Sequence, residues 1–177
     1  SWKACVQITD IILQTFAMAL QIPEDFFIAN HNAQAHTLRL LHYPPLEQPP
    51  KQGQVRAGEH SDYGSITLLF QDDIGGLEVQ TKNGEWIAAP AIPDTIIVNT
   101  GDLMQRWTNH VFCSTKHRVA IPTDEKMKRS RYSIAFFCHP NDDTEVACLP
   151  SCCTDRVAIY PSISAKDYLI SRLEATY

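Results

Sequence analysis

Residues 60–70 read HSDYGSITLLF, in which two metal-binding residue types stand directly before a short apolar run. A short apolar run bounded by turn residues is typical of a buried strand. Similar runs follow one another at 38–41, 66–70, 77–80, 86–88, 96–99, 111–121 and 131–137, and turn pairs such as Pro44-Pro45, Gly75-Gly76 and Asn83-Gly84 separate them. The pattern predicts a mostly antiparallel β sandwich or barrel.

Helical segments flank these strands. Apolar positions three or four apart over residues 2–20 predict an amphipathic helix, and Pro23 favours a short second helix. Ser164 is a candidate N-cap for a closing helix over residues 164–177. We therefore expect one domain over 1–177, with a helical lead-in at about 1–30, a β core at about 36–140 and a C-terminal helix at about 164–177.

Charge and hydropathy exclude several classes of partner. The net charge of -5 and the pI near 5.7 give no basic footprint for a phosphate backbone, so we expect no nucleic-acid partner. The start lacks a secretory signal pattern, and no stretch approaches the ~18 apolar residues needed to cross a bilayer. We expect a cytoplasmic protein without a membrane partner.

The six cysteines contain no C-x-x-C pair, and the adjacent Cys152 and Cys153 cannot easily bridge each other. We expect reduced, mostly structural thiols.

His60 and Asp62 are two residues apart, so in an extended segment both side chains point to the same side and can chelate one ion. An imidazole and a carboxylate need a third donor to complete the facial triad that suits ferrous iron. That donor must come from another strand.

His117 is the candidate third donor. Within residues 111–121 the odd positions are small or apolar, which predicts that this face is buried and that His117 points inward. His110 is the rival, but it follows a turn-like Thr108-Asn109 pair and belongs to the other face of the expected strand.

Arg131 and Ser133 begin the last expected strand and share one face. A guanidinium matches a carboxylate with a fork of donors, and a hydroxyl adds one more hydrogen bond. An inward arginine therefore indicates either a ligand with a carboxylate or a structural ion pair with an internal Asp or Glu.

Three other features of the sequence can be explained by a structural role. Asp102 is expected to cap residues 103–107 rather than act as a catalytic carboxylate, and Gly75-Gly76 is expected to turn a hairpin. Four apolar residues at strand spacing belong either to the core or to a substrate pocket: Phe70, Leu77, Met104 and Phe137.

Taken together, several motifs resemble one enzyme family along the whole chain. They are LRLLHYPP at 38–45, HSDYGSITLL at 60–69, GGLEV at 75–79, NTGD at 99–102, STKHRV at 114–119 and RYS at 131–133. The sequence resembles the isopenicillin N synthase-like branch of the iron(II) and 2-oxoglutarate oxygenases. That resemblance implies a double-stranded β helix, which is a jelly-roll, cupin-like fold.

The resemblance also implies roles. His60, Asp62 and His117 would bind Fe(II), while Arg131, Ser133 and Tyr43 would hold the distal carboxylate of 2-oxoglutarate. Leu41 stands where many plant members have Asn. The implied enzyme is a dioxygenase that uses O2 to oxidise, usually to hydroxylate, a small organic molecule, and that releases succinate and carbon dioxide.

Two alternatives stay open. One is a ferrous oxidase of the same fold that does not use 2-oxoglutarate, and the other is a catalytically silent metal-binding or ligand-binding member. A nucleobase such as thymine, a terpenoid or a phenol would fit the branch as substrate.

Relatives in this branch have well over a hundred residues before the first helix seen here. We therefore expect the chain to leave an unpaired strand edge and an apolar surface open, which favours self-association.

Overall fold

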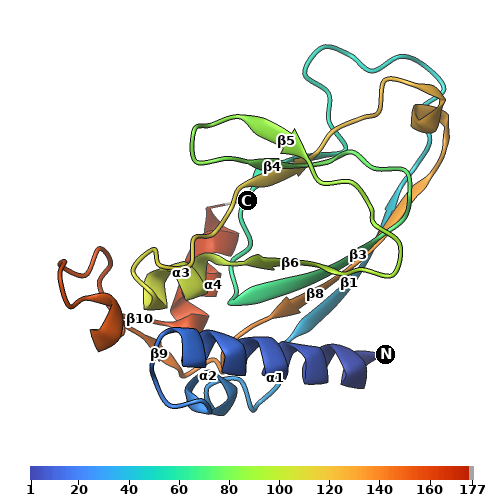
Figure 1. Cartoon of the computed structure of the whole chain (residues 1–177). Coiled ribbons are helices and arrows are strands. Elements are labelled where there is room, and N and C mark those ends of the chain that lie inside the picture. Colours follow the sequence, from blue (N-terminus) through green and yellow to red (C-terminus); the bar gives the residue numbers. More distant parts are fainter. Residues whose placement is uncertain (176–177) are drawn as a thin grey trace.

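Two four-stranded antiparallel sheets face each other in the computed structural model, which describes residues 1–175 (Figure 1). The major sheet has the order β1 (Thr37–Tyr43), β8 (Arg131–Cys138), β3 (Ile66–Gln71), β6 (Ile97–Thr100). The minor sheet has the order β2 (Ala57–His60), β7 (His117–Val119), β4 (Leu77–Gln80), β5 (Trp86–Ala88). This arrangement confirms the predicted jelly-roll fold.

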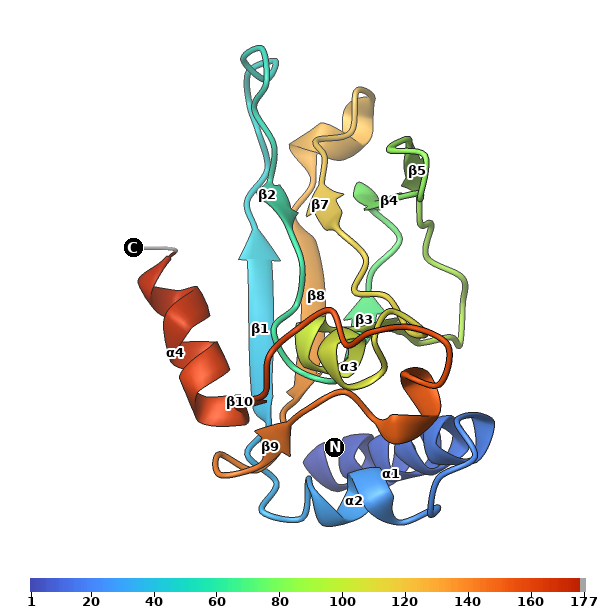
Figure 2. The same ribbon diagram turned by 90° about the vertical axis from the view of Figure 1, so that its left-hand side faces the viewer.

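Helices cover the outside of the major sheet and one end of the molecule. The elements outside the two sheets are α1 (Trp2–Ala19), α2 (Phe26–Ala29), α3 (Asp102–Trp107), α4 (Ala165–Glu174), the 3-10 turns η1 (Glu125–Lys128) and η2 (Pro150–Cys152), and the small pair β9 (Glu145–Val146) with β10 (Ile163–Ser164). Figure 1 shows α1 beneath the major sheet, on the side away from β4 and β5. Figure 2 shows α4 beside β1. No helix within residues 1–175 combines the length and apolar character needed to cross a membrane.

The helix predictions hold with small changes. The first helix ends at Ala19, and the second begins at Phe26, after Pro23 rather than with it. Ser164 is the N-cap of α4, because its hydroxyl accepts a hydrogen bond from the Asp167 backbone N–H. Residues 176 and 177 of the predicted closing helix lie outside the described residues.

Side-chain alternation on β3 and β8 divides the major sheet into two faces. Leu68 and Phe136 point outward and are fully buried in the cluster formed with α1 and with Trp107. Thr67 and Ser133 point inward, toward the minor sheet. The part of the outward face that packs against α1 therefore forms the core, and the inward face carries polar groups between the two sheets.

The expected strand over residues 111–121 is wrong except for β7. Asn109 and His110 have positive φ values of 49° and 68°, so the chain turns sharply after α3. The following backbone is held by side chains: the Ser114 N–H donates to Gln105 Oε1 at 2.9 Å, for example. Val111 is 49% exposed, so the odd positions do not form one buried face.

The Gly75-Gly76 pair does not turn a hairpin. It links β3 of the major sheet to β4 of the minor sheet, with φ values of 79° and 93°. A Cβ at Gly76 would lie 2.5 Å from the carbonyl oxygen of Ala120, so the crossing needs glycine there. Gly84, in contrast, lies in the turn between the paired strands β4 and β5, as predicted.

The cysteine prediction is wrong at one place. Cys148 and Cys153 form a disulfide between residues 5 apart in sequence, whereas the adjacent Cys152 stays free. Cys5, Cys113 and Cys138 are also free thiols. Burial raises the pKa of the Cys138 thiol, which suits a structural role.

Candidate metal and co-substrate site

His60, Asp62 and His117 come together between the two sheets. Strands β2 and β7 pair antiparallel with His60 opposite His117, so the two rings lie 4.3 Å apart at an angle of 57°. Asp62 follows β2 on the same side, and one ligand atom from each residue lies within 4.8 Å of the other two. Backbone pairing and the two-residue spacing thus place three ligand types around one point.

Hydrogen bonds to backbone carbonyls indicate the tautomer of both histidines. Nδ1 of His60 is 2.8 Å from the Gly58 carbonyl oxygen, and Nδ1 of His117 is 3.1 Å from that of Thr115. A carbonyl oxygen only accepts, so in each ring Nδ1 carries the proton and the Nε2 lone pair is left for another partner. This is the form in which a neutral imidazole binds a metal.

The Asp62 carboxylate is 6% exposed and is held by one oxygen. Its Oδ2 accepts hydrogen bonds from Thr67 Oγ1 and Asn99 Nδ2, both at 2.7 Å. Its Oδ1 lies 3.7 Å from Nε2 of His117. Two neutral imidazole nitrogens and one buried carboxylate oxygen form the donor set of a ferrous facial triad, so these residues fit Fe(II).

Thr67 and Asn99 were not identified from the sequence as partners of Asp62. They are direct register partners on β3 and β6, and both face the inside of the barrel. Two polar residues within otherwise apolar strands were the available signal. Because sequence alone does not give the register of two strands, the pair could not be matched.

His110, the rival ligand, lies elsewhere. Its ring stacks on Tyr160 with centroids 5.5 Å apart, and its Nε2 is 2.6 Å from the Tyr160 hydroxyl. The cluster of side chains within residues 1–175 that could hold a metal does not include it.

Arg131 is 1% exposed, and its three donor nitrogens are all engaged. Nε donates to the Gly75 carbonyl at 3.0 Å, Nη1 to Ser133 Oγ at 3.3 Å and Nη2 to Gln71 Oε1 at 3.0 Å. The guanidinium lies over the ring of Tyr43, 5.1 Å from its centroid. These contacts fix the direction of the cation without neutralising it.

The alternative of a structural ion pair is wrong for Arg131. Among the described residues no carboxylate lies within ion-pair distance of its guanidinium. Burial lowers the pKa of Arg131, an effect opposed by Tyr43 and Asp72. A buried cation without an anionic partner is costly, which favours a ligand that supplies the negative charge.

A cavity of about 180 Å³ joins the triad to Arg131. Its walls include Tyr43, Ser133 and all three triad residues. The cavity therefore has ligand atoms for a metal at one end and a cation with a neighbouring hydroxyl at the other. Leu41 also lines it, so the position where many plant members have Asn contributes an apolar contact here.

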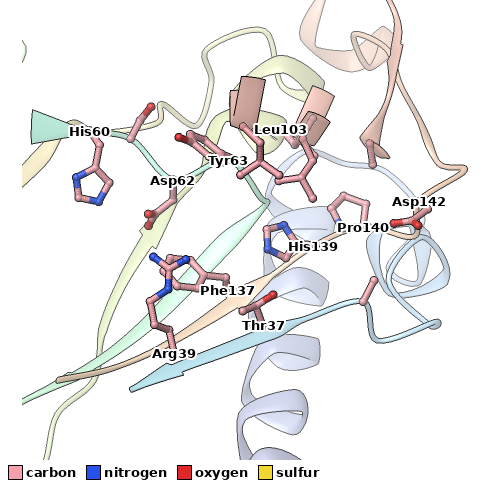
Figure 3. Close-up of a pocket in the computed structure, with 15 residues that line it drawn as sticks. Thr37, Arg39, His60, Asp62, Tyr63, Leu103, Phe137, His139, Pro140 and Asp142 are labelled. Carbon is pink, nitrogen blue, oxygen red and sulfur yellow. The ribbon is translucent and has the colours of Figure 1, made fainter. Parts of the chain in front are cut away.

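A second, larger cavity of about 330 Å³ opens on the other side of His60 and Asp62 (Figure 3). Arg39 and Phe137 line both cavities. The sequence did not single out Arg39 beyond its place in the LRLLHYPP motif. The feature that could have identified it is a charged residue an even number of positions from Tyr43 on the same strand, which puts both side chains on the inner face.

The four apolar residues that were candidates for either the core or a substrate pocket fall into both groups. Leu77 and Phe137 line the smaller cavity, whereas Met104 is buried in the core and Phe70 packs against it. Asp102 is the first residue of α3 rather than its cap, because the N-cap is Gly101. Its Oδ2 accepts a hydrogen bond from the Tyr168 hydroxyl at 2.8 Å.

Two facing antiparallel sheets with a two-histidine, one-carboxylate cluster between them are the architecture of the non-haem oxygenases with a double-stranded β helix. The sequence profile of the 2OG-Fe(II) oxygenase superfamily matches residues 23–140. The chain belongs to this superfamily. Fe(II) and 2-oxoglutarate are the metal and the co-substrate that give the class its name.

Relatives with names agree with this membership. A 2-oxoglutarate-dependent dioxygenase, htyE of Aspergillus rugulosus, is 35% identical over 186 residues, which cover 99% of this chain and 56% of that protein. A proline hydroxylase, buaE of Petromyces alliaceus, is 38% identical over 174 residues, with coverage of 94% and 54%. The chain thus spans about half the length of these relatives.

Among solved structures, a full-length Neurospora crassa protein in complex with alpha-KG and thymine superposes with a TM-score of 0.90 and 40% identity. The match covers 99% of this chain and 55% of that one. A putative 2OG-Fe(II) oxygenase from Caulobacter crescentus superposes with a TM-score of 0.89 at 34% identity, covering 99% and 57%.

Proposed function

We propose that this chain is the catalytic part of an iron(II)- and 2-oxoglutarate-dependent dioxygenase that oxidises a small organic molecule. His60, Asp62 and His117 are the proposed iron ligands. The observation that carries the proposal is the cluster of one ligand atom from each of these residues within 4.8 Å of one another. The Nδ1 contacts of both histidines with backbone carbonyls leave their Nε2 atoms for a metal. We also propose that residues 1–177 act as one domain.

Arg131, Ser133 and Tyr43 are the proposed binding residues for the distal carboxylate of 2-oxoglutarate. The absence of an ion-paired carboxylate at Arg131 among the described residues supports this role, since a dianionic co-substrate would supply the missing charge. A short α-keto dicarboxylate fits a cavity of about 180 Å³ that has a cation at one end and the triad at the other.

When bound, the metal would supply the oxygen chemistry that couples decarboxylation of the co-substrate to substrate oxidation. For hydroxylation the balance is R–H, 2-oxoglutarate and O2 going to R–OH, succinate and CO2. Asp62 and the two histidines would hold the metal and leave room on it for the co-substrate and O2. Arg131 fixes the co-substrate by its far end, which sets the direction of the reacting keto acid.

The substrate is proposed as a small organic molecule. The Neurospora crassa protein, whose structures contain thymine or 5-formyluracil, supports a compact ring compound of this size. Arg131 does not decide against a ferrous oxidase that does not use 2-oxoglutarate, because its guanidinium matches the carboxylate of any ligand. Succinate formation separates the two. The cytoplasmic location and the lack of nucleic-acid and membrane partners stay predictions.

Succinate formation tests the proposed function. The chain would be incubated with Fe(II), 2-oxoglutarate and O2, and succinate would be quantified against an Asp62→Ala variant. We expect succinate from the parent chain and a loss of at least about 100-fold in the variant, because losing a ligand should cost more than the roughly 10- to 100-fold of losing a ligand's hydrogen-bond partner. Equal, background-level succinate from both chains would contradict 2-oxoglutarate chemistry and leave the ferrous oxidase or the silent binding module.

We further propose self-association through the outer face of β1 and β8. Leu40 is 73% exposed there, and Leu38, Tyr132 and Ile134 are exposed beside it. β1 is an edge of the major sheet, so one of its two edges has no strand partner among the described residues. An apolar surface next to an open strand edge favours contact with a second copy.

A further inference from the structure

We infer that the cavity of about 330 Å³ is the site of the organic substrate. We infer further that it takes a small planar molecule with a carbonyl or carboxylate oxygen, which receives hydrogen bonds from Arg39 while its ring packs against Phe137. The inference rests on the proposed function and specifies its substrate class. This cavity borders His60 and Asp62 and adds the apolar wall of α3 and α4, which the co-substrate cavity lacks.

The register of β1 and β8 sets the two ends of the site. Tyr43 lies opposite Arg131, and Thr37 lies opposite Phe137, with Arg39 opposite Ala135 between them. All these side chains line the inner face. One strand pair therefore presents one arginine at the co-substrate end and a second near the substrate end, with Asp62 above the second arginine in Figure 3.

The two arginines differ in how they are held. Every donor nitrogen of Arg131 is engaged by protein. Arg39 donates no hydrogen bond and forms no ion pair within residues 1–175, and its guanidinium lies over the Phe137 ring at 5.4 Å from the centroid. Its fork of donors is thus available to a ligand oxygen, and a planar group can share the aromatic surface.

The opposite wall is apolar and fixed in place. Leu103 of α3 and Leu169 and Leu173 of α4 line the cavity. α4 is attached by the Tyr168 hydroxyl, which donates to Asp102, and by Arg172, whose guanidinium lies 5.4 Å from the ring centroid of Tyr63. An apolar wall facing one cation suits a ring with a polar edge.

The size of the cavity suits a small ligand. Ligand cavities in proteins range from about 300 to 1,000 Å³, so this one lies at the small end of the range. A single ring with one or two substituents fits a space of this volume. His139 and Asp142 at the far end offer further polar contacts to the ring substituents (Figure 3).

Ligand NMR on the full chain loaded with Mn(II) and 2-oxoglutarate tests the inference, because paramagnetic relaxation reports ligand protons near the metal. The probes are uracil, benzoate and toluene, which present a neutral carbonyl, a carboxylate and no oxygen acceptor on rings of similar size. We expect strong relaxation for uracil or benzoate and none for toluene. Whichever of uracil and benzoate binds more tightly shows whether the site takes a neutral carbonyl or a carboxylate.

Arg39→Met should weaken binding of the preferred probe roughly 10-fold. Arg39 also lines the co-substrate cavity, so 2-oxoglutarate affinity is measured beside it and should fall much less than probe affinity. Retained 2-oxoglutarate binding also shows that the variant folds. Arg39→Gln, which keeps one donor group, should recover part of the affinity for uracil. Arg129→Met is the matched control, because Arg129 is exposed and pairs with Asp73, and it should change neither ligand.

Three results would overturn the inference: toluene relaxing as strongly as the others, no probe relaxing while Mn(II) and 2-oxoglutarate bind, or Arg39→Met weakening 2-oxoglutarate instead. These results leave the proposed function intact. Failure of the parent chain to bind Mn(II) and 2-oxoglutarate would overturn the proposed function, and this inference with it.

Discussion

Nε2 of His117 lies 3.7 Å from Oδ1 of Asp62, while the other oxygen of that carboxylate is held by Thr67 and Asn99. The two hydrogen bonds to Oδ2 leave Oδ1 directed at the histidine. A cation between the two atoms would neutralise a carboxylate that is otherwise buried. Hydrogen bonds within the protein therefore arrange the triad for a metal.

Removing one partner of Asp62 should weaken metal binding. Thr67→Val keeps the shape of the side chain but removes the hydroxyl that donates to Oδ2. We expect a loss of about 10- to 100-fold in Mn(II) affinity, the range seen when a hydrogen-bond partner of a ligand is lost. Calorimetric titration measures it, with the exposed Thr95→Val as control. Equal affinities in both variants would show that Thr67 does not orient the carboxylate.

Arg131→Lys should weaken 2-oxoglutarate binding roughly 10- to 100-fold, because an ammonium cannot make the two-pronged contact of a guanidinium. Metal affinity should stay within about twofold. Titration of 2-oxoglutarate into the Mn(II)-loaded chain gives both values, and Arg129→Lys serves as an exposed control. Unchanged co-substrate affinity would mean that Arg131 only supports the fold.

Stability should fall as the solution becomes acidic because of His31. Its Nδ1 donates to the Phe27 carbonyl at 2.6 Å, and its Nε2 accepts from Ser65 at 2.9 Å, so the buried ring is neutral. Burial lowers its pKa from 6.5 to about 4. The stabilisation is complete above pH 6.5 and declines as the pH falls toward 4, since the unfolded chain then binds a proton that the folded chain does not.

The lowering of the His31 pKa from 6.5 to about 4 corresponds to an effect on the order of 3 kcal/mol, since each pKa unit is worth about 1.4 kcal/mol. His36, whose pKa burial also lowers to about 4, adds to the same slope. Urea unfolding between about pH 7 and about pH 4.5 should give a shallower dependence for His31→Gln than for the parent chain, although the variant is less stable overall. Parallel curves would contradict the role of His31.

The open edge of β1 should make the chain associate. Sedimentation velocity of the parent chain should show species larger than a monomer that increase with concentration. Leu40→Lys should shift the distribution toward the monomer, because a charge on the exposed face opposes edge pairing. Val157→Lys, at an exposed position in a loop, should not. A monomeric parent chain would refute self-association.

Much of the candidate site could be predicted from local patterns in the sequence. The two-residue spacing of Arg131 and Ser133 predicted their common face because alternation along a strand depends only on neighbours. The same rule put His60 and Asp62 on one side. The assignment of the three ligands stays a prediction until a metal is measured, although their side chains meet in one place.

Features that depend on strand register or on the path of the chain between sheets could not be predicted. The pairing of Thr67 with Asn99 needed the register of β3 and β6. Alternation suggested a long strand before His117, but the turn at Asn109 and His110 and the side-chain contacts of the following loop leave only the short strand β7. Gly75-Gly76 was predicted to turn a hairpin because a tight hairpin turn and this crossing between the two sheets both use glycines with positive φ.

Anaerobic Fe(II) titration, followed by absorption in the visible range with and without 2-oxoglutarate, tests the central claim most directly. We expect one Fe(II) per chain and a new charge-transfer absorption only after 2-oxoglutarate is added. His117→Ala should lose both signals, and His110→Ala should keep both. Iron binding that survives in His117→Ala but fails in His110→Ala, or an absorption that does not respond to 2-oxoglutarate, would contradict it.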